Sequence, residues 1–185
     1  MHRILRNLAV GLMIPVAGVA GLGCARMPAG FGVVPPPLEA QGPGTVFPSI
    51  EDAAIDALIY AYLHAEAARD QRMRGGTIHP TPGGYTYDEV IVASRVDPSA
   101  ISYRLKPQDV ARFHLYAEPV RLDNRIPEEP TDSDRRSVRF WDPLHRPLYV
   151  LHPSFVVRVL RGSTGELVDV ADLRQPGREL LVAGE

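Results

Sequence analysis

Residues 49–76 read SIEDAAIDALIYAYLHAEAARDQRMRGG and carry the clearest periodic pattern in this 185-residue chain. Ser49 lies three residues before Asp52, an arrangement close to a capping box at the start of a helix. Apolar residues then recur three and four positions apart, as on one helical face: Ile55, Leu58, Ile59, Tyr62 and Leu63. Cations that suit a helix C-terminus follow: Arg69, Arg72 and Arg74. Because Gly75-Gly76 ends the pattern, we predict a helix over residues 49–74.

Beyond Gly76 the pattern changes from helical to alternating, which predicts strands. The turn Pro82-Gly83-Gly84 separates one strand at 76–80 from its partner at 85–94. We expect further strands at 110–116, 148–151, 155–160 and 167–170, a long loop at 118–134 and a short helix at 132–141. One leading helix over a mainly antiparallel sheet makes the fold class α+β.

The start of the chain is typical of a secretory signal peptide. Arg3 and Arg6 precede an uncharged run of 15 residues, 8–22, which is too short and too rich in Gly and Pro for a comfortable membrane-spanning helix. The run ends at Cys24, the sole cysteine. This ending resembles a bacterial lipobox, although Leu22 lies two residues before the cysteine rather than three. We therefore expect residues 1–23 to be removed and Cys24 to be lipidated.

A lipid-modified Cys24 implies a location on the cell envelope. Ala25, directly after the cysteine, resembles a sorting signal for the outer membrane, so we expect the domain to face the periplasm. Cleavage near Ala20 by an ordinary signal peptidase is the alternative, and it would give a secreted or soluble periplasmic protein.

Residues 24–47 are rich in proline and glycine, including Pro35-Pro36-Pro37 and Gly42-Pro43-Gly44. Such runs do not build helices or central strands. We interpret this segment as a semi-extended tether. The folded domain is then expected at 48–175, followed by a tail at 176–185.

The composition excludes several classes of protein. Hydrophobic residues make up 45% and charged residues 23%, which is ordinary for a globular domain. A net charge of −2 gives no basic field to attract nucleic acid, so we expect no nucleic-acid partner. A single cysteine rules out an intramolecular disulfide and a cysteine-rich zinc site.

Familiar catalytic motifs are missing from the sequence. The six histidines form no H-E-x-x-H pattern, and the chain has no Walker loop and no G-x-S-x-G elbow. A catalytic triad assembled in space stays open, because triads are recognised by geometry rather than by sequence.

Several short motifs nevertheless follow one another in a distinctive order. A helix containing AAIDAL leads into Gly75-Gly76-Thr77-Ile78 and then a GGYTY hairpin. VARFH comes next at the end of a strand, then TDSD at 131–134, and YVLHP at 149–153 completes the set. This order resembles the JAMM metalloprotease fold, especially the JAMM-like domains attached to Rhs repeats and other secreted bacterial proteins. The resemblance covers residues 49–160 and implies a JAMM/deaminase-like fold.

The resemblance also implies a metal site. In that family a Glu before the Gly-Gly polarises a zinc-bound water, while two histidines of an H-x-H and the Asp of an S-x-x-D bind the zinc. Here His114 matches the first histidine, and Tyr116 stands in place of the second. Thr131 and Asp134 match the S-x-x-D, with Thr for Ser, and Met73 occupies the position of the Glu. His114 and Asp134 are therefore the candidate metal ligands, with Met73, Tyr116 and Thr131 as their neighbours.

The two replaced positions argue against catalysis. One His and one Asp make a weak zinc site, and without the Glu no general base is evident. We assign no catalytic residue and expect no cofactor; if a metal is bound, it is expected to be zinc. The prediction is an envelope-anchored binding or scaffold module, a pseudoenzyme with a protein partner on the acidic 123–134 loop or the old cleft.

The alternative is a zinc-dependent peptidase or isopeptidase with rearranged ligands. His64 or His152 would then supply a missing ligand, although each is also an ordinary structural histidine. Glu66 could turn inward as a base, or it could face solvent and pair with Arg69. A small structural lipoprotein without a concave polar site is a third interpretation.

Overall fold

The computed structural model describes residues 38–70, 72–102, 104–116, 130–152 and 154–174. All of them belong to one compact unit, Val33–Glu185. This unit contains the helices α1 (Ile50–Ala68) and α2 (Asp132–Arg136), the latter continued by the π-helix η1 (Ser137–Trp141). Its strands are β1 (Arg74–Thr81), β2 (Gly84–Tyr87), β3 (Ile91–Val92), β4 (Ala111–Leu115), β5 (Leu148–Leu151), β6 (Val156–Leu160) and β7 (Leu167–Asp172).

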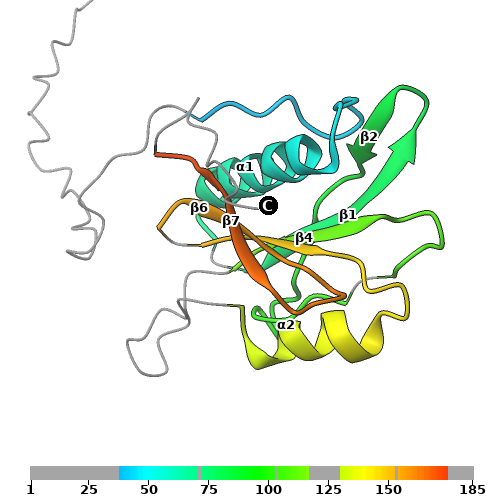
Figure 1. Ribbon diagram of the computed structural model, residues 1–185. Coiled ribbons are helices and arrows are strands. Elements are labelled where there is room, and N and C mark those ends of the chain that lie inside the picture. The colour runs from blue at the N-terminus through cyan, green and yellow to red at the C-terminus, as the bar shows by residue number, and fades with distance from the viewer. Residues whose placement is uncertain (1–37, 71, 103, 117–129, 153, 175–185) are drawn as a thin grey trace, which may run out of the picture. The chain divides into compact units, whose positions relative to one another are not determined.

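The strands form one seven-stranded sheet in the order β2-β1-β4-β5-β6-β7, with β3 also paired to β1. Every pairing is antiparallel except that of β4 with β5, which is parallel. The helix α1 covers one face of the sheet, and α2 with η1 lies against the other (Figure 1). The predicted α+β class with a mainly antiparallel sheet is therefore confirmed.

Helix α1 begins as predicted and ends earlier. The Ser49 hydroxyl accepts the Asp52 N–H at 3.0 Å. At the other end, Arg69 adopts left-handed backbone angles (φ 50°) and closes the helix, so the predicted extension to residue 74 is wrong. Asp70 then accepts the N–H and the guanidinium of Arg72, and this bonding lowers the pKa of Asp70 to about 2. These bonds lead the chain into β1.

Gly75 and Gly76 lie inside β1 rather than at a helix end. Gly75 pairs with His114 and Gly76 with Phe113 of β4. A Cβ on Gly76 would come within 2.9 Å of the Phe113 ring. The second glycine therefore permits an aromatic ring to pack flat on the strand, and it does not stop the helix.

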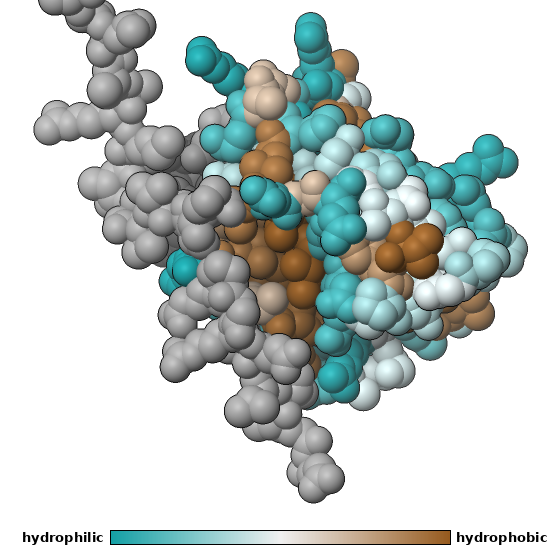
Figure 2. Space-filling view, turned by 90° about the horizontal axis from the view of Figure 1, so that it is seen from above, coloured by the Kyte–Doolittle hydropathy of each residue, from teal (hydrophilic) through white to brown (hydrophobic). Residues whose placement is uncertain are grey.

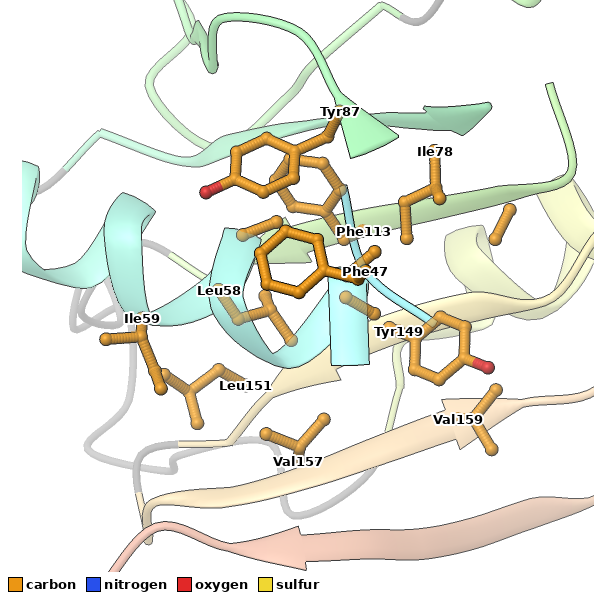
Figure 3. Packing of buried hydrophobic residues seen from close by; sticks show 14 of the residues in the cluster. Phe47, Leu58, Ile59, Ile78, Tyr87, Phe113, Tyr149, Leu151, Val157 and Val159 are labelled. Carbon is orange, nitrogen blue, oxygen red and sulfur yellow. The ribbon is translucent and has the colours of Figure 1, made fainter. Parts of the chain in front are cut away.

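The face of α1 that packs on the sheet is rich in alanine. Its most buried residues are Ala53, Ala54, Ala57, Leu58 and Ala61. Of the predicted apolar stripe, Ile55, Tyr62 and Leu63 are only partly buried. Small side chains let the helix approach Tyr87, Phe113 and Tyr149 of the sheet closely (Figure 3). Seen from above, apolar side chains form a central strip and smaller separate patches among mostly polar ones (Figure 2).

The folded domain begins earlier than the predicted boundary at residue 48. Asp56, buried on α1, accepts the backbone N–H groups of Gln41 at 2.7 Å and Gly42 at 3.0 Å. Its carboxylate also accepts the Tyr87 hydroxyl at 2.6 Å. Phe47 is buried in the core and exchanges two backbone hydrogen bonds with Tyr85. Residues 38–47, which we predicted as tether, are thus part of the domain.

Most other predicted elements are confirmed with small changes of boundary. The predicted strand at 85–94 is divided into β2 and β3, which both pair with β1. The predicted short helix at 132–141 is present, with π geometry in its second half. Within the described residues, no helix is long and apolar enough to cross a bilayer. The signal peptide, Cys24, residues 117–129 and the tail lie outside the described residues.

Candidate functional site

The sequence VARFHL places side chains alternately on the two faces of β4. Phe113 and Ala111 face α1 and join the main core. The residues that alternate with them, Arg112 and His114, are also buried. They point to the opposite face, where a second, smaller apolar cluster packs: Val138, Leu148, Val150 and Leu160. One strand therefore supplies both an apolar face and a row of buried polar groups.

The TDSD motif forms a capping box at the start of α2. The Asp134 N–H donates to the Thr131 hydroxyl oxygen at 3.3 Å, and Asp134 Oδ2 accepts the Thr131 N–H at 2.9 Å. Spacing of a Thr three residues before an acid is the usual signature of this cap. The motif that the family resemblance assigns to zinc binding therefore has a complete local role in starting a helix.

Tyr116 connects this helix start to the end of β4. Its hydroxyl donates to Asp134 Oδ2 at 2.7 Å. Its ring packs edge-on against the His114 ring, with the two centroids 4.7 Å apart. The residue that replaces the expected second histidine thus contacts both candidate metal ligands.

His114 faces the same carboxylate. Its Nε2 lies 3.8 Å from Asp134 Oδ1, which is longer than a hydrogen bond. Its side chain is only 3% exposed, and that of Asp134 is 13% exposed. Burial lowers the pKa of His114, and nearby Arg112 lowers it further, while Asp134 partly offsets both. We therefore expect a neutral imidazole at pH 7.

The structure brings four predicted residues into one cluster: His114, Tyr116, Thr131 and Asp134. The fifth, Met73, directly precedes Arg74, which pairs with Leu115 of β4. The Met73 N–H donates to the Pro98 carbonyl, and the Met73 carbonyl accepts the Ala93 N–H, both at 2.8 Å. Met73 therefore directly precedes β1, one residue beyond the pair of Arg74 and Leu115.

The proposed substitute ligands do not complete the cluster. His64 is exposed on α1, against the other face of the sheet, and stacks on Tyr60 at 4.2 Å. His152 follows β5, and its Nδ1 lies 2.7 Å from the Ser154 hydroxyl. Glu66 is exposed, in agreement with the solvent-facing alternative for that residue. In the described part of the chain, no three His, Cys, Asp or Glu side chains come together as a metal site.

Three polar contacts near the cluster were not predicted from the sequence. The Arg112 guanidinium donates to the Ser137 hydroxyl at 2.6 Å and so ties β4 to η1. Asp142 and Arg146 form a buried ion pair at 2.8 Å. Arg146 also donates to the Asp109 carbonyl at 2.6 Å, which joins the loops before β4 and β5. The spacing of Asp142 and Arg146, four residues apart in DPLHR, could have predicted their ion pair.

No family model, no curated protein and no solved structure matches this chain.

Proposed function

We propose that this chain is an envelope-anchored lipoprotein whose JAMM-like domain is a non-catalytic binding or scaffold module. The observation that carries the proposal is the hydrogen bond from the Tyr116 hydroxyl to Asp134 Oδ2. In this account the bond joins the two positions that a zinc ion joins in the enzymes of the family. The domain has kept the arrangement and replaced the metal with a direct contact.

The bonding of Asp134 supports a structural role for the cluster. Oδ2 accepts from three donors: the Tyr116 hydroxyl, the Thr131 hydroxyl and the Thr131 N–H, at 2.7, 2.6 and 2.9 Å. A carboxylate oxygen has about two lone pairs, so this oxygen is fully used. Hydrogen bonds to a charged group are worth about 1.5–3 kcal/mol each. A metal ion at Oδ2 would have to displace them.

Burial and the residue at the base position support the same role. A catalytic zinc ion keeps one coordination position open for water or substrate. The candidate ligands His114 and Asp134 are instead covered, with side chains 3% and 13% exposed. Met73 stands where the family has its Glu, and a thioether cannot take a proton from water at neutral pH. The cluster can hold β4 and α2 together, which is what a rigid binding module needs.

One observation favours the alternative, a zinc-dependent peptidase or isopeptidase. His114 Nε2 and Asp134 Oδ1 face each other at 3.8 Å, and a neutral imidazole is the form that ligates metals. A three-ligand site would need one more group, and the described residues bring none to this pair. The described residues therefore do not fit the zinc centre of the family, and we derive no hydrolytic step.

The anchoring part of the proposal rests on the signal-peptide pattern and on Cys24. Cells that produce the full chain, or its Cys24→Ser variant, should be fractionated after labelling with a radioactive fatty acid. We expect the wild-type chain to carry the label and to sediment with membranes. The variant should lose both properties. An unlabelled wild-type chain, or a variant that still sediments, would refute the lipid anchor.

The binding part is tested by cross-linking the full chain in intact cells of its source. We expect one reproducible cross-linked partner from the envelope, retained by the double variant His114→Gln/Asp134→Asn if that variant is folded. Peptidase activity on the captured partner, lost in the same variant, would instead establish the enzyme. A chain that cross-links to nothing at any cross-linker length would contradict a binding role.

A further inference from the structure

The continuous helix made by α2 and η1 has a fixed inner side. Val138 is 1% exposed and belongs to the small apolar cluster on the sheet. The Ser137 hydroxyl accepts from the buried guanidinium of Arg112 at 2.6 Å. These contacts hold the helix on the face of the sheet opposite α1 (Figure 1). The outer side of the helix is thereby presented in a defined orientation.

The outer side of this helix combines arginines with an exposed aromatic ring. Arg136 and Arg139 are exposed, and Arg135 is half-buried. Phe140 is 70% exposed, which is unusual for a large apolar side chain. The Arg139 guanidinium lies over the Phe140 ring, 5.4 Å from its centroid. An exposed aromatic ring and a guanidinium group thus lie side by side on this surface.

These side chains border a shallow, open hollow of about 230 Å³, lined by Asp132, Arg135, Arg136, Arg139 and Phe140. We call it the Arg–Phe hollow. Both parts of the helix line the hollow, with Arg135 and Arg136 from α2 and Arg139 and Phe140 from η1. Single-turn π segments inside helices are frequently found at functional sites.

The charge of the hollow is opposite to that of the chain. Three arginines line it against one carboxylate, that of Asp132, whereas the whole chain has a net charge of −2. Among the described residues, neither Arg136 nor Arg139 forms an ion pair. Guanidinium groups bind carboxylates through two parallel hydrogen bonds and also stack on aromatic groups.

We propose that the Arg–Phe hollow binds an acidic protein segment in which an aromatic side chain is flanked by carboxylates. The arginines would pair with the carboxylates, while the aromatic group packs against Phe140. This inference rests on the proposed binding function and names the chemistry of its partner. Because the hollow is shallow and open, the segment would lie across it rather than enter it.

The test measures binding of a fluorescent peptide, acetyl-Gly-Glu-Glu-Trp-Glu-Glu-Gly, to the full chain in mild detergent by anisotropy. The matched probe has Gln in place of each Glu. We expect the acidic peptide to bind and the Gln peptide to bind at least about tenfold more weakly, because each charge-assisted contact is worth more than a neutral one. Added salt should weaken the acidic peptide's binding.

Variants assign the binding to the hollow. Arg136→Ala/Arg139→Ala should weaken binding at least about tenfold, and Phe140→Ser should weaken it to a smaller extent. The control Arg95→Ala/Arg104→Ala removes the same charge at exposed positions away from the helix and should leave binding unchanged. Equal loss in both double variants, or no binding by the wild-type chain, would overturn the proposal. Tighter binding to phosphatidylglycerol vesicles than to the peptide, lost in Arg136→Ala/Arg139→Ala, would overturn it in favour of a membrane contact.

The two proposals can fail separately. If the cross-linked envelope partner is retained by Arg136→Ala/Arg139→Ala, the binding function stands and the Arg–Phe hollow is not its site. If the peptide binds at the hollow but no partner is captured in cells, the surface chemistry stands and the proposed function fails.

Discussion

The hydroxyl of Tyr116 donates to Oδ2 of Asp134 over 2.7 Å, across 18 positions of sequence. Tyr116 directly follows β4, and Asp134 lies in the first turn of α2. The bond therefore fixes where the helix starts relative to the sheet. It also uses the carboxylate that the JAMM resemblance assigns to zinc, so one contact explains both the position of α2 and the proposed loss of catalysis.

Removing this hydroxyl should destabilise the domain. We expect Tyr116→Phe to lower the free energy of unfolding by about 1.5–3 kcal/mol, since a hydrogen bond to a charged group is lost. Urea denaturation measures the change. Tyr85→Phe is the matched control, because no hydrogen bond of the Tyr85 hydroxyl is found among the described residues and its loss should cost under about 0.5 kcal/mol. Equal effects of the two variants would remove the special role of Tyr116.

Restoring the histidine should create a metal site. We expect Tyr116→His to bind zinc with one-to-one stoichiometry, because it adds a third ligand beside His114 and Asp134 and removes a donor from Oδ2. Equilibrium dialysis with metal analysis measures the bound zinc. The double variant Tyr116→His/Asp134→Ala should bind none. If Tyr116→His folds and gains no zinc, the correspondence between this cluster and the metal site of the family is mistaken.

The carboxylate of Asp56 should be the strongest single polar contribution to the first half of the domain. It accepts from Gln41, Gly42 and Tyr87 and is buried on α1. Asp56→Ala should lower the free energy of unfolding by roughly 3 kcal/mol, because three donors lose their acceptor. Thermal or urea unfolding checks this, with exposed Glu89→Ala as a control near zero. A loss under about 1 kcal/mol would show that residues 38–47 are not held by Asp56.

Acid should destabilise the domain partly through His114. Burial lowers the pKa of this histidine in the folded chain, so the unfolded chain takes up its proton more readily below the ordinary value of about 6.5. The free energy of unfolding should therefore fall as the pH drops through 6.5 and below. His114→Gln should flatten this slope, whereas exposed His64→Gln should keep it. Urea denaturation at a series of pH values between about 7 and 5 distinguishes the variants, and identical slopes would contradict the assignment.

Some elements were predicted correctly because their positions depend on short, local sequence patterns. The cap at Ser49, the hairpin at Pro82-Gly83 and the alternation along 110–116 all predicted what the structure contains. The end of α1 depends on tertiary pairing instead. Arg74 to Gly76 pair with β4, and Arg74 and Gly75 also pair with β3, so these residues belong to a strand and not to the helix. No local sequence pattern at Arg69 predicts that α1 ends there.

Two further differences also arise from long-range contacts. The run Gly42-Pro43-Gly44 indicated a semi-extended tether, but both glycines have positive φ angles in a turn that Asp56 of α1 holds by hydrogen bonds. The predicted apolar face of α1 consisted of large side chains only. The alanines of α1 are in fact among its most buried residues, because small side chains allow the closest approach to the sheet. Composition alone does not reveal either arrangement.

The sequence predicted that four of the candidate residues lie close together, but it did not predict the hydrogen bonds between them. His114, Tyr116, Thr131 and Asp134 meet in space as the order of motifs suggested. That Thr131 and Asp134 form a capping box could have been seen from the TDSD spacing itself. The hydroxyl bond of Tyr116 to that box required the position of β4 beside α2, which only the fold supplies.

The most direct test of a non-catalytic domain is a zinc titration by calorimetry on the metal-free full chain, repeated on Asp134→Ala. We predict no stoichiometric heat of binding for the wild-type chain and no difference between the two proteins, because three donors already occupy Asp134 Oδ2 and, among the described residues, no third ligand joins His114 and Asp134. Tight one-to-one zinc binding by the wild-type chain that disappears in Asp134→Ala would contradict it and establish a metal centre.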